Sequence, residues 1–453
     1  MTLKNNNKKI FKSSVEEENF FLKKHIKSLQ KLNEEISKDN EKIFDSYKKI
    51  SLSRSWRFIS FFHSFTNKFK KLKKKIFTNK TDQKLQKKTK PELLIDVTHI
   101  YKHDHKTGIQ RVVRALIGSF EELLPSEYAL KTIYLENGFF YNTKNKKLIN
   151  AEKGDIFLGL DFNASIVNSA FLLNYWKRHN GVKIYFVLYD LLPIHYPNWW
   201  GEDISFKHLQ WAKYILEISD KIFCISETVA KDLRQFKERF DIFNEADIST
   251  FNLGYDLSNS LPTMGLPSNY KILTQEINNH NSFLMVGTLE PRKGHNDVLY
   301  VFEELWESGN DSILVIVGKK GWLIDNLVQR IKENKWLNKK LFYFNNASDE
   351  FLEKLYRSCD SLIAASYAEG FGLPIIEALS QGLSVIARDI EIFREVGKDS
   401  ITYFDSSDSL SYLISNFCEN SNIRQSKSDK FSIYSWQESG KEILTQILGG
   451  QLN

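Results

Sequence analysis

The chain contains 453 residues, of which 42% are hydrophobic and 13% aromatic, enough for about three domain-sized units with buried cores. Its formal net charge of +7 is unevenly distributed, because residues 1–90 hold 25 Lys and Arg against 9 Asp and Glu, whereas the remainder holds 38 against 47. We therefore expect no affinity of the folded body for nucleic acid, and we expect any anionic surface to be met by residues 1–90.

The cysteines and the hydropathy of the chain indicate a reducing compartment. Cys224, Cys359 and Cys418 are isolated, without the paired spacing of a metal site or a disulfide framework. No apolar run approaches the roughly 18 residues that span a bilayer, and residues 1–20 are too polar for a signal peptide. The sequence predicts a cytoplasmic protein, associated with the inner membrane only peripherally.

Residues 1–90 are predicted to form a helical tail. Within residues 22–50, apolar side chains recur every seven positions, which is the pattern of a short coiled coil. These side chains are Leu22, Leu29, Ile36, Ile43 and Ile50. Asp39 and Asn40 interrupt the second apolar stripe, so the number of strands stays open. The segment is expected to associate with itself or with a partner helix.

Residues 53–77 have the pattern of a basic amphipathic helix. The apolar side chains are spaced alternately four and three residues apart, and lysines fill the other positions. The apolar positions are Phe58, Phe62, Phe65, Phe69, Leu72 and Ile76. Such a helix suits an anionic membrane surface, where each lysine contributes about 1 kcal/mol. The alternatives are a continued coiled coil and a helix packed on the body. The polar residues 78–90 indicate a linker.

The first folded domain is predicted at residues 91–270. A buried strand at 93–98 is followed by a polar loop and by a helix that begins near Gly108. Further strands are predicted at 156–160, 183–189 and 221–225. Ligands bind at the carboxyl ends of the strands in doubly wound sheets, so Gly108 and Arg111 are candidate site residues. The alternative for this pair is plain helix initiation and a surface charge.

The strand at 183–189 ends in Asp190, and a Pro-stiffened loop with several aromatic residues follows. Carboxylates accept hydrogen bonds from sugar hydroxyls, and aromatic rings stack on sugar C–H faces. Asp190 and His195 are therefore candidates for binding an acceptor sugar. A single loop histidine is more often a bystander than a site residue, and this alternative stays open for His195.

The second folded domain is predicted at residues 271–425. A strand at 282–286 leads into a loop that contains Gly287, Arg292 and Lys293. An arginine fork beside a lysine point charge, at the carboxyl end of a strand, suits a diphosphate. The alternative is two solvated surface charges. Residues 426–453 are predicted to hold a last helix.

The stretch at 369–379 has the pattern of a glycine loop that opens a helix. Gly370 and Gly372 free the backbone, and Pro374 suits the first helical turn. Unpaired amides at such a terminus can hold a phosphate. Glu369 and Glu377 flank the terminus and are expected to meet different parts of an elongated ligand. The alternative is an ordinary strand-to-helix turn with two surface glutamates.

The run from Glu369 to Ala378 resembles the E-x7-E signature of GT4, a family of retaining glycosyltransferases with the GT-B fold. This resemblance implies an α/β protein with two Rossmann-like, doubly wound parallel-sheet domains, a cleft between them, and a last helix that crosses back to the first domain. It assigns the donor hexose to Glu369, the nucleotide ribose to Glu377, and the diphosphate to the loop around Arg292, Lys293, Phe371 and Gly372. The adjoining Leu373, with Gly287 and Gly370, completes the implied donor site.

The residues Thr107 to Arg111 resemble the first loop of bacterial mannosyltransferases within GT4, in which the glycine lies near the donor phosphates. The resemblance implies transfer of mannose from GDP-mannose to a glycan or polyprenyl-linked acceptor in surface-glycan synthesis. It implies Arg292, Lys293 and Glu369 as the catalytic group, with no metal and no further cofactor. The alternatives are a UDP-sugar donor and a catalytically inactive scaffold protein of a polysaccharide-synthesis complex.

Overall fold

The computed structural model describes residues 88–104, 107–244, 246–255, 265–419 and 434–450. The coiled coil predicted at 22–50 and the amphipathic helix predicted at 53–77 lie outside these residues. Among the helices that are described, none combines the length and apolar character that a membrane span requires.

The first sheet has seven strands in the order β3-β2-β1-β4-β5-β6-β7, and every neighbouring pair except β2–β3 is parallel. The strands are β1 (Glu92–Asp96), β2 (Ala129–Glu136), β3 (Phe139–Asn142), β4 (Ile156–Gly159), β5 (Lys183–Leu188), β6 (Lys221–Cys224) and β7 (Asp247–Thr250). Each β-strand from β4 to β6 is buried over at least three successive residues, as expected for a sheet covered on both faces.

The helices around this sheet begin with α3 (Thr98–Lys102) and α4 (Gly108–Leu123), and α4 starts at a capping box formed by Thr107 and Gln110. The others are η1 (Ala164–Ser169), α5 (Ala170–Asn180), α6 (Leu192–His195), α7 (Pro197–Trp200), α8 (Glu202–Ile218) and α9 (Glu227–Arg239). Ser226 caps α9 by accepting a hydrogen bond from the Val229 amide, which is the role that its position before the helix predicts.

The hairpin β2–β3 was not predicted, and it makes the first sheet mixed rather than wholly parallel. Its turn is Asn137-Gly138, and both residues have positive φ, at 51° and 82°. An Asn-Gly pair between two apolar runs is the signal of such a turn. The signal is therefore present in the sequence, and the hairpin adds one antiparallel strand at the sheet edge.

The second sheet has six parallel strands in the order β10-β9-β8-β11-β12-β13. They are β8 (Ser282–Val286), β9 (Ile313–Val317), β10 (Leu341–Phe344), β11 (Ser361–Ala364), β12 (Ser384–Arg388) and β13 (Thr402–Phe404). The helices are α10 (Tyr270–Asn278), η2 (Pro291–Lys293), α11 (His295–Glu307), α12 (Asp325–Lys332), α13 (Asp349–Ser358), α14 (Leu373–Ser380), α15 (Glu391–Gly397), η3 (Lys398–Ser400) and α16 (Ser407–Glu419).

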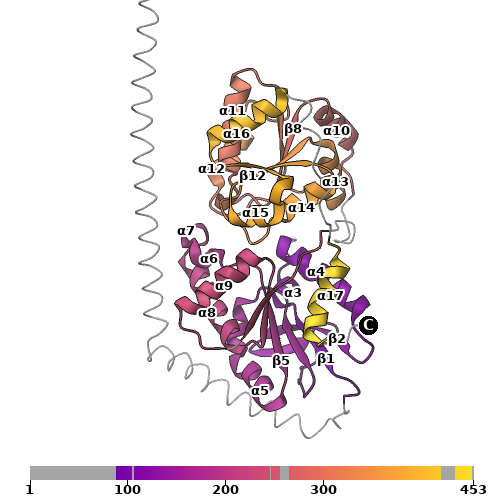
Figure 1. Cartoon of the computed structure of the whole chain (residues 1–453). Coiled ribbons are helices and arrows are strands. Elements are labelled where there is room, and N and C mark those ends of the chain that lie inside the picture. The colour runs from indigo at the N-terminus through magenta and orange to yellow at the C-terminus, as the bar shows by residue number, and fades with distance from the viewer. Residues whose placement is uncertain (1–87, 105–106, 245, 256–264, 420–433, 451–453) are drawn as a thin grey trace, which may run out of the picture. The chain divides into compact units, whose positions relative to one another are not determined.

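Helices cover both faces of the second sheet (Figure 1). Each face has its own apolar core. One core joins the sheet to α10, α13, α14 and α15, and the other joins it to α11, α12 and α16. Alternate residues of β8 and β9 point to opposite cores: Leu284 and Val315 belong to the first, and Met285 and Leu314 to the second. The predicted pair of Rossmann-like α/β domains is confirmed.

The last helix, α17 (Trp436–Ile447), packs against α4 of the first sheet's helical layer. A side chain at Gly440 would approach Ser119 Oγ to 2.0 Å, so the glycine permits this close contact. The Gln446 side chain also lies 3.1 Å from Lys221 Nζ and from Ser249 Oγ. The chain thus returns to the first sheet after completing the second.

Candidate functional site

The loop after β8 presents Arg292 and Lys293 from the short 3-10 helix η2. Gly294 ends this turn with φ of 70°, and a Cβ there would lie 2.3 Å from the Ala365 carbonyl oxygen. A side chain at this position would therefore be strained and would push the loop away from the end of β11. The glycine holds the two cations against the neighbouring strand end, where Glu369 follows in the chain.

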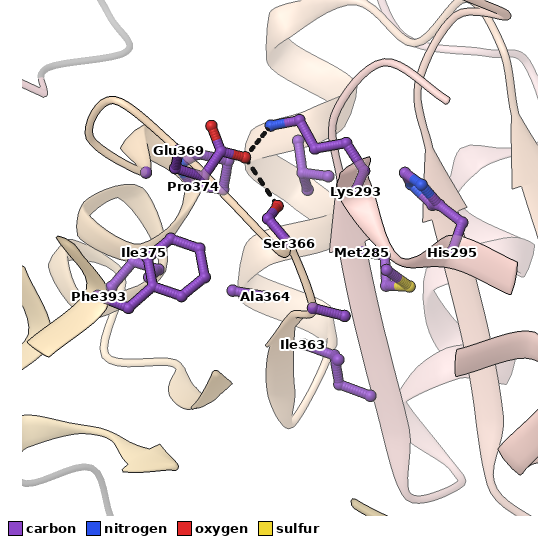
Figure 2. Close-up of a pocket in the computed structure, with 13 residues that line it drawn as sticks. Met285, Lys293, His295, Ile363, Ala364, Ser366, Glu369, Pro374, Ile375 and Phe393 are labelled. Atoms are coloured by element: carbon purple, nitrogen blue, oxygen red, sulfur yellow. Dashed lines mark hydrogen bonds and ion pairs between the residues drawn. The ribbon is translucent and has the colours of Figure 1, made fainter. Parts of the chain in front are cut away.

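The carboxylate of Glu369 is surrounded by cations and one hydroxyl. Arg292 Nη1 lies 2.7 Å from its Oε2, and Ser366 Oγ donates to its Oε1 at 2.7 Å. Lys293 Nζ also donates to Oε1, as Figure 2 shows. The second arm of Arg292 reaches Glu290 at 2.8 Å. Two cations and two carboxylates thus form one compact cluster, in which Glu290 is buried and the other three side chains are partly exposed.

The charge balance of this cluster sets the protonation of Glu369. Burial opposes its charged form, but Arg292 and Lys293 outweigh burial and lower its pKa to about 2. For Glu290, burial outweighs the same two cations and raises the pKa. Glu369 is therefore an ionised acceptor at neutral pH. An incoming anion would have to share Arg292 and Lys293 with it.

A small pocket lies beside this cluster, within the second domain, and Figure 2 shows Lys293, Glu369 and His295 around it. It encloses about 20 Å³, which is room for about one water molecule and not for a nucleotide. Both ring nitrogens of His295 are buried without a hydrogen-bond partner in the described part of the chain. Burial, and then the Lys293 charge, lower the pKa of His295 to about 3, so its imidazole is neutral.

The glycine loop before α14 makes a close backbone contact with the loop after β5. A Cβ on Gly370 would lie 2.3 Å from the Tyr189 carbonyl oxygen, and Ser226 Oγ donates to the Gly370 carbonyl at 3.0 Å. Gly372 caps α14 with φ of 103°, and Pro374 stands in the first turn. Only a residue without a side chain fits at Gly370, so this glycine permits the approach of two strand ends.

Glu377 lies one turn inside α14 and is 2% exposed. Tyr356 Oη donates to its Oε2 at 2.7 Å, and Arg111 Nη1 donates to its Oε1. Arg111 also lies 3.4 Å from Asp349 Oδ1. Both oxygens of Glu377 are thus engaged. Arg111, predicted on the acceptor side, pairs with the residue that the resemblance assigns to the donor ribose.

The other predicted residues of the first domain occupy strand ends and helix starts. Gly108 is the first residue of α4, and a Cβ on it would lie 3.8 Å from Leu373 Cδ1. Leu373 follows Phe371 and Gly372 in the sequence. Asp190 follows β5, and its Oδ1 accepts a hydrogen bond from the Leu192 amide at 3.0 Å. His195 is the last residue of α6, five positions further along the chain.

Sequence reasoning missed a pair of buried carboxylates in the first domain. Asp96 is the last residue of β1, and Asp161 lies two residues after β4. Asp96 accepts hydrogen bonds from the Thr98 amide at 3.0 Å and from Asn163 Nδ2 at 2.9 Å. Asp161 Oδ2 accepts from the Ile100 amide at 2.6 Å, and its Oδ1 has no partner in the described residues. Burial, and to a lesser degree the nearby Asp96 charge, raise the pKa of Asp161 to about 7.

Sequence reasoning also missed Glu290, His295 and Tyr356, which contact or flank the predicted residues. Glu290 and His295 stand next to the predicted loop, so their place in the chain was the available signal. Tyr356 lies on α13 and has no such signal, because only folding brings it to Glu377. Over the described ranges, no group of three or more His, Cys, Asp and Glu side chains is arranged to hold a metal ion.

Comparison with known proteins agrees with this geometry. Residues 273–431 match the family described as "Glycosyl transferases group 1". The serotype-specific mannosyltransferase WbdA of Escherichia coli is 37% identical over 330 residues, which cover 69% of this chain and 40% of WbdA. The chain therefore spans about two fifths of the length of this relative.

Solved structures with the same arrangement of sheets are more distant in sequence. Anabaena Alr3699/HepE in complex with UDP and glucose superposes with a TM-score of 0.53 at 14% identity, over 80% of this chain and 97% of that chain. WaaG, a glycosyltransferase involved in lipopolysaccharide biosynthesis, gives a TM-score of 0.53 at 14% identity, over 79% and 100%. At this identity the likeness shows the fold alone, and that fold is GT-B.

The match over residues 273–431 encloses the whole charge cluster, since Arg292, Lys293, Glu290 and Glu369 all fall within it, and it also encloses Glu377. The predicted resemblance to glycosyltransferases is thereby confirmed. Residues 273–431 thus match a glycosyl transferases group 1 domain, and the chain has the GT-B fold.

Proposed function

We propose that the chain is a retaining glycosyltransferase that moves mannose from GDP-mannose onto a lipid-linked or polysaccharide acceptor in bacterial surface-glycan synthesis. The observation that carries this proposal is the ionised Glu369 held by Arg292 and Lys293 at adjoining strand ends. The similarity to WbdA, a protein named as a mannosyltransferase, favours mannose as the transferred sugar.

In the proposed reaction, the bond between the hexose C1 and a phosphate oxygen breaks, and a bond between C1 and an acceptor hydroxyl oxygen forms. The hydroxyl proton leaves with the nucleoside diphosphate, so atoms and charge balance. Negative charge gathers on the leaving diphosphate, and preorganised cations are the strongest device for stabilising it. Arg292 and Lys293 would take this role, while Glu369 accepts hydrogen bonds from the hexose hydroxyls.

The nucleotide would lie further along α14, where Glu377 can accept hydrogen bonds from the ribose. Arg111 and Tyr356 fix the orientation of this carboxylate through its two oxygens. We propose that the reaction needs no metal, because Arg292 and Lys293 supply the positive charge at the phosphates. Full activity in the presence of a chelator is the expected result, and loss of activity restored by Mg²⁺ would contradict it.

Calorimetry of the full chain tests the donor assignment. GDP-mannose, UDP-glucose, UDP-N-acetylglucosamine and dTDP-rhamnose are titrated into the wild-type protein, Glu377→Ala, and Glu307→Ala as a matched surface control. We expect GDP-mannose to bind the wild type and the control, and to lose most of its affinity for Glu377→Ala. Tighter binding of a UDP-sugar would show that the donor is a UDP-sugar and not GDP-mannose. No binding at all would favour the alternative of a catalytically inactive scaffold protein.

We also propose that the basic residues 53–77 bring the enzyme to the inner face of an anionic membrane, and that residues 22–50 associate with a second helix. These proposals rest on the sequence pattern. Co-sedimentation of the full chain with phosphatidylglycerol vesicles checks the first. Undiminished sedimentation after Lys70, Lys71 and Lys73 are changed to Gln would count against it.

A further inference from the structure

Four aromatic side chains form a continuous row beside Arg292. Neighbouring ring centroids lie 6.5 Å apart between Tyr367 and Trp199, 6.0 Å between Trp199 and Trp200, and 6.2 Å between Trp200 and Trp322. The Arg292 guanidinium carbon lies 5.9 Å from the centroid of the Trp200 ring. The rings come from the segments after β5, β9 and β11, so only the folded chain assembles this aromatic row.

We propose that the aromatic row binds sugar residues of the acceptor glycan, next to the cations that hold the donor diphosphate. The inference deepens the proposed function and rests on it. It assigns the acceptor side to Trp322, Tyr367 and their neighbours Trp199 and Trp200. The sequence named Asp190, His195 and Arg111 as candidates and noted the aromatic residues after Asp190, but it gave no sign of Trp322 or Tyr367.

The Trp322 end of the row is held by the loop after β8. The Gly321 amide donates to the Leu289 carbonyl at 2.9 Å, and a Cβ on Gly321 would lie 2.5 Å from that same oxygen. Trp322 Nε1 donates to the Trp199 carbonyl. The indole nitrogen is therefore satisfied while the side chain remains 40% exposed. Hydrogen bonds to two backbone carbonyls therefore fix the position of the ring, with the Trp200 ring as its neighbour.

The Tyr367 end is held just as firmly. Its amide donates to the Arg292 carbonyl at 2.8 Å, and its hydroxyl donates to Asp297. The Arg388 guanidinium carbon lies 4.0 Å from the ring centroid and so covers one face of the ring. The side chain is nevertheless 44% exposed. A ring that is supported on one side and open to solvent elsewhere is preorganised for stacking.

The chemistry of the row fits a glycan. The face of an aromatic ring carries negative charge density, which attracts the weakly positive C–H groups on the flat side of a hexose. The hexose hydroxyls meanwhile point outward to water and polar groups. Successive rings lie 6.0–6.5 Å apart and are tilted by 38–59° to one another, so each ring can stack on a different sugar, which suits a chain of sugars better than a single small molecule.

The place of the row favours the acceptor over the donor's base. The Tyr367 amide donates a hydrogen bond to the Arg292 carbonyl, and Tyr367 stands two positions before Glu369. Arg292 is assigned to the diphosphate and Glu369 to the hexose. The ribose is assigned to Glu377, whose partners are Tyr356 and Arg111. The row therefore adjoins the hexose end, where an acceptor hydroxyl must approach.

The experiment compares Trp322→Ala and Tyr367→Ala with Trp322→Phe and Tyr367→Phe, which keep a ring, and with Tyr412→Ala as an exposed aromatic control on α16. Initial rates of the full chain are measured against an α-linked mannotetraose and against GDP-mannose. Mannotetraose is also titrated calorimetrically without donor. We expect the alanine variants to raise the KM for mannotetraose and weaken its binding about three- to tenfold, the effect of losing one stacked ring.

The donor KM should stay within about twofold of wild type in all variants, and the phenylalanine variants should recover most acceptor affinity. A raised donor KM with unchanged acceptor KM would overturn the proposal and make the row a base-stacking surface. Unchanged affinity for mannotetraose in both alanine variants would overturn it outright. If the wild type binds mannotetraose but turns over no donor, and the alanine variants lose that binding, the row stands and the proposed function is removed.

Discussion

Each sheet has a pair of carboxylates near the carboxyl ends of its parallel strands: Glu290 and Glu369 in the second sheet, and Asp96 and Asp161 in the first. The two pairs are stabilised by different kinds of partner. In the second sheet, Glu369 is met by Arg292 and Lys293, and its pKa is lowered to about 2. In the first sheet, Asp96 and Asp161 receive hydrogen bonds from neutral donors, and burial raises the pKa of Asp161 to about 7.

At neutral pH the carboxylate Glu369 of the second sheet is ionised, whereas Asp161 of the first sheet can become neutral. The cations of the second sheet can be shared with an incoming anion, because Glu369 and Glu290 already hold them in place. The first sheet offers acceptors with no excess of positive charge, which is unsuitable for a phosphate. We therefore expect an anion to bind at the strand ends of the second sheet rather than beside Asp96 and Asp161.

The largest expected effect comes from removing a cation of the second sheet. Arg292→Gln should lower kcat for mannose transfer by about 100- to 1,000-fold, since it removes a preorganised donor to the developing charge. Arg292→Lys should recover part of this loss, because it keeps the charge but not the fork that contacts Glu290 and Glu369. Steady-state kinetics with saturating GDP-mannose provide the measurement.

Lys335→Gln is the matched control, because Lys335 is a largely exposed cation of the same domain paired with Glu307. Its activity should equal that of the wild type. Thermal denaturation of each variant separates lost chemistry from lost folding. Wild-type turnover in a well-folded Arg292→Gln protein would remove the charge cluster from the mechanism.

The next effect is on stability and comes from Asp161 in the first sheet. Its native pKa of about 7 lies above the unfolded value of 3.8, so the native state binds more protons between these values. This contribution to stability is complete below about pH 4 and is lost as the pH rises through about 7, by a few kcal/mol at most. Asp161→Asn should reduce the dependence of the free energy of unfolding on pH and make the protein more stable than wild type at pH 8.

Urea unfolding at pH 5 and pH 8 provides the measurement, with the exposed Asp325→Asn as the control. The control should keep the wild-type slope. Glu369 has the opposite sign, because its lowered pKa stabilises the native state above about pH 4.5 and loses effect only as the pH falls toward 2. An Asp161→Asn protein with an unchanged pH slope would falsify the assignment.

The smallest expected effect concerns Arg111 and Glu377. A double-mutant cycle with Arg111→Gln and Glu377→Gln should give a coupling energy of about 1–3 kcal/mol, because the pair is shielded and shares Tyr356. The exposed pair Lys231–Glu391 is the matched control and should couple negligibly. Equal coupling in the two cycles, measured by urea unfolding, would show that Arg111 does not hold Glu377 in solution.

Much of the fold follows from local patterns. The strand β9 is a short run of branched apolar residues, and β5 and β12 bury shorter apolar runs. The helix after Gly372 begins with a proline in its first turn. The antiparallel β2–β3 hairpin was not predicted, although the Asn137-Gly138 pair is typical of its turn. The tail predicted from heptads and lysines lies outside the described residues, so it stays a prediction.

The candidate site was only partly predictable. Glu369, Arg292 and Lys293 carry their chemistry in short motifs, and the fold brings their side chains into contact. That Arg111 pairs with Glu377 was not foreseen, because 266 positions separate the two residues in sequence. A long-range ion pair leaves no periodic or local signal, and it becomes visible only once the helices are placed.

The sequence by itself determined the two α/β sheets, the glycine loops and the identity of the charged residues, because each depends on spacing within one segment. Only the tertiary structure decided which charges meet, how far each is removed from water, and that Tyr367, Trp199, Trp200 and Trp322 line up beside Arg292. Burial and charge pairing are properties of neighbours in space. Those neighbours come here from strand ends that are far apart in the chain.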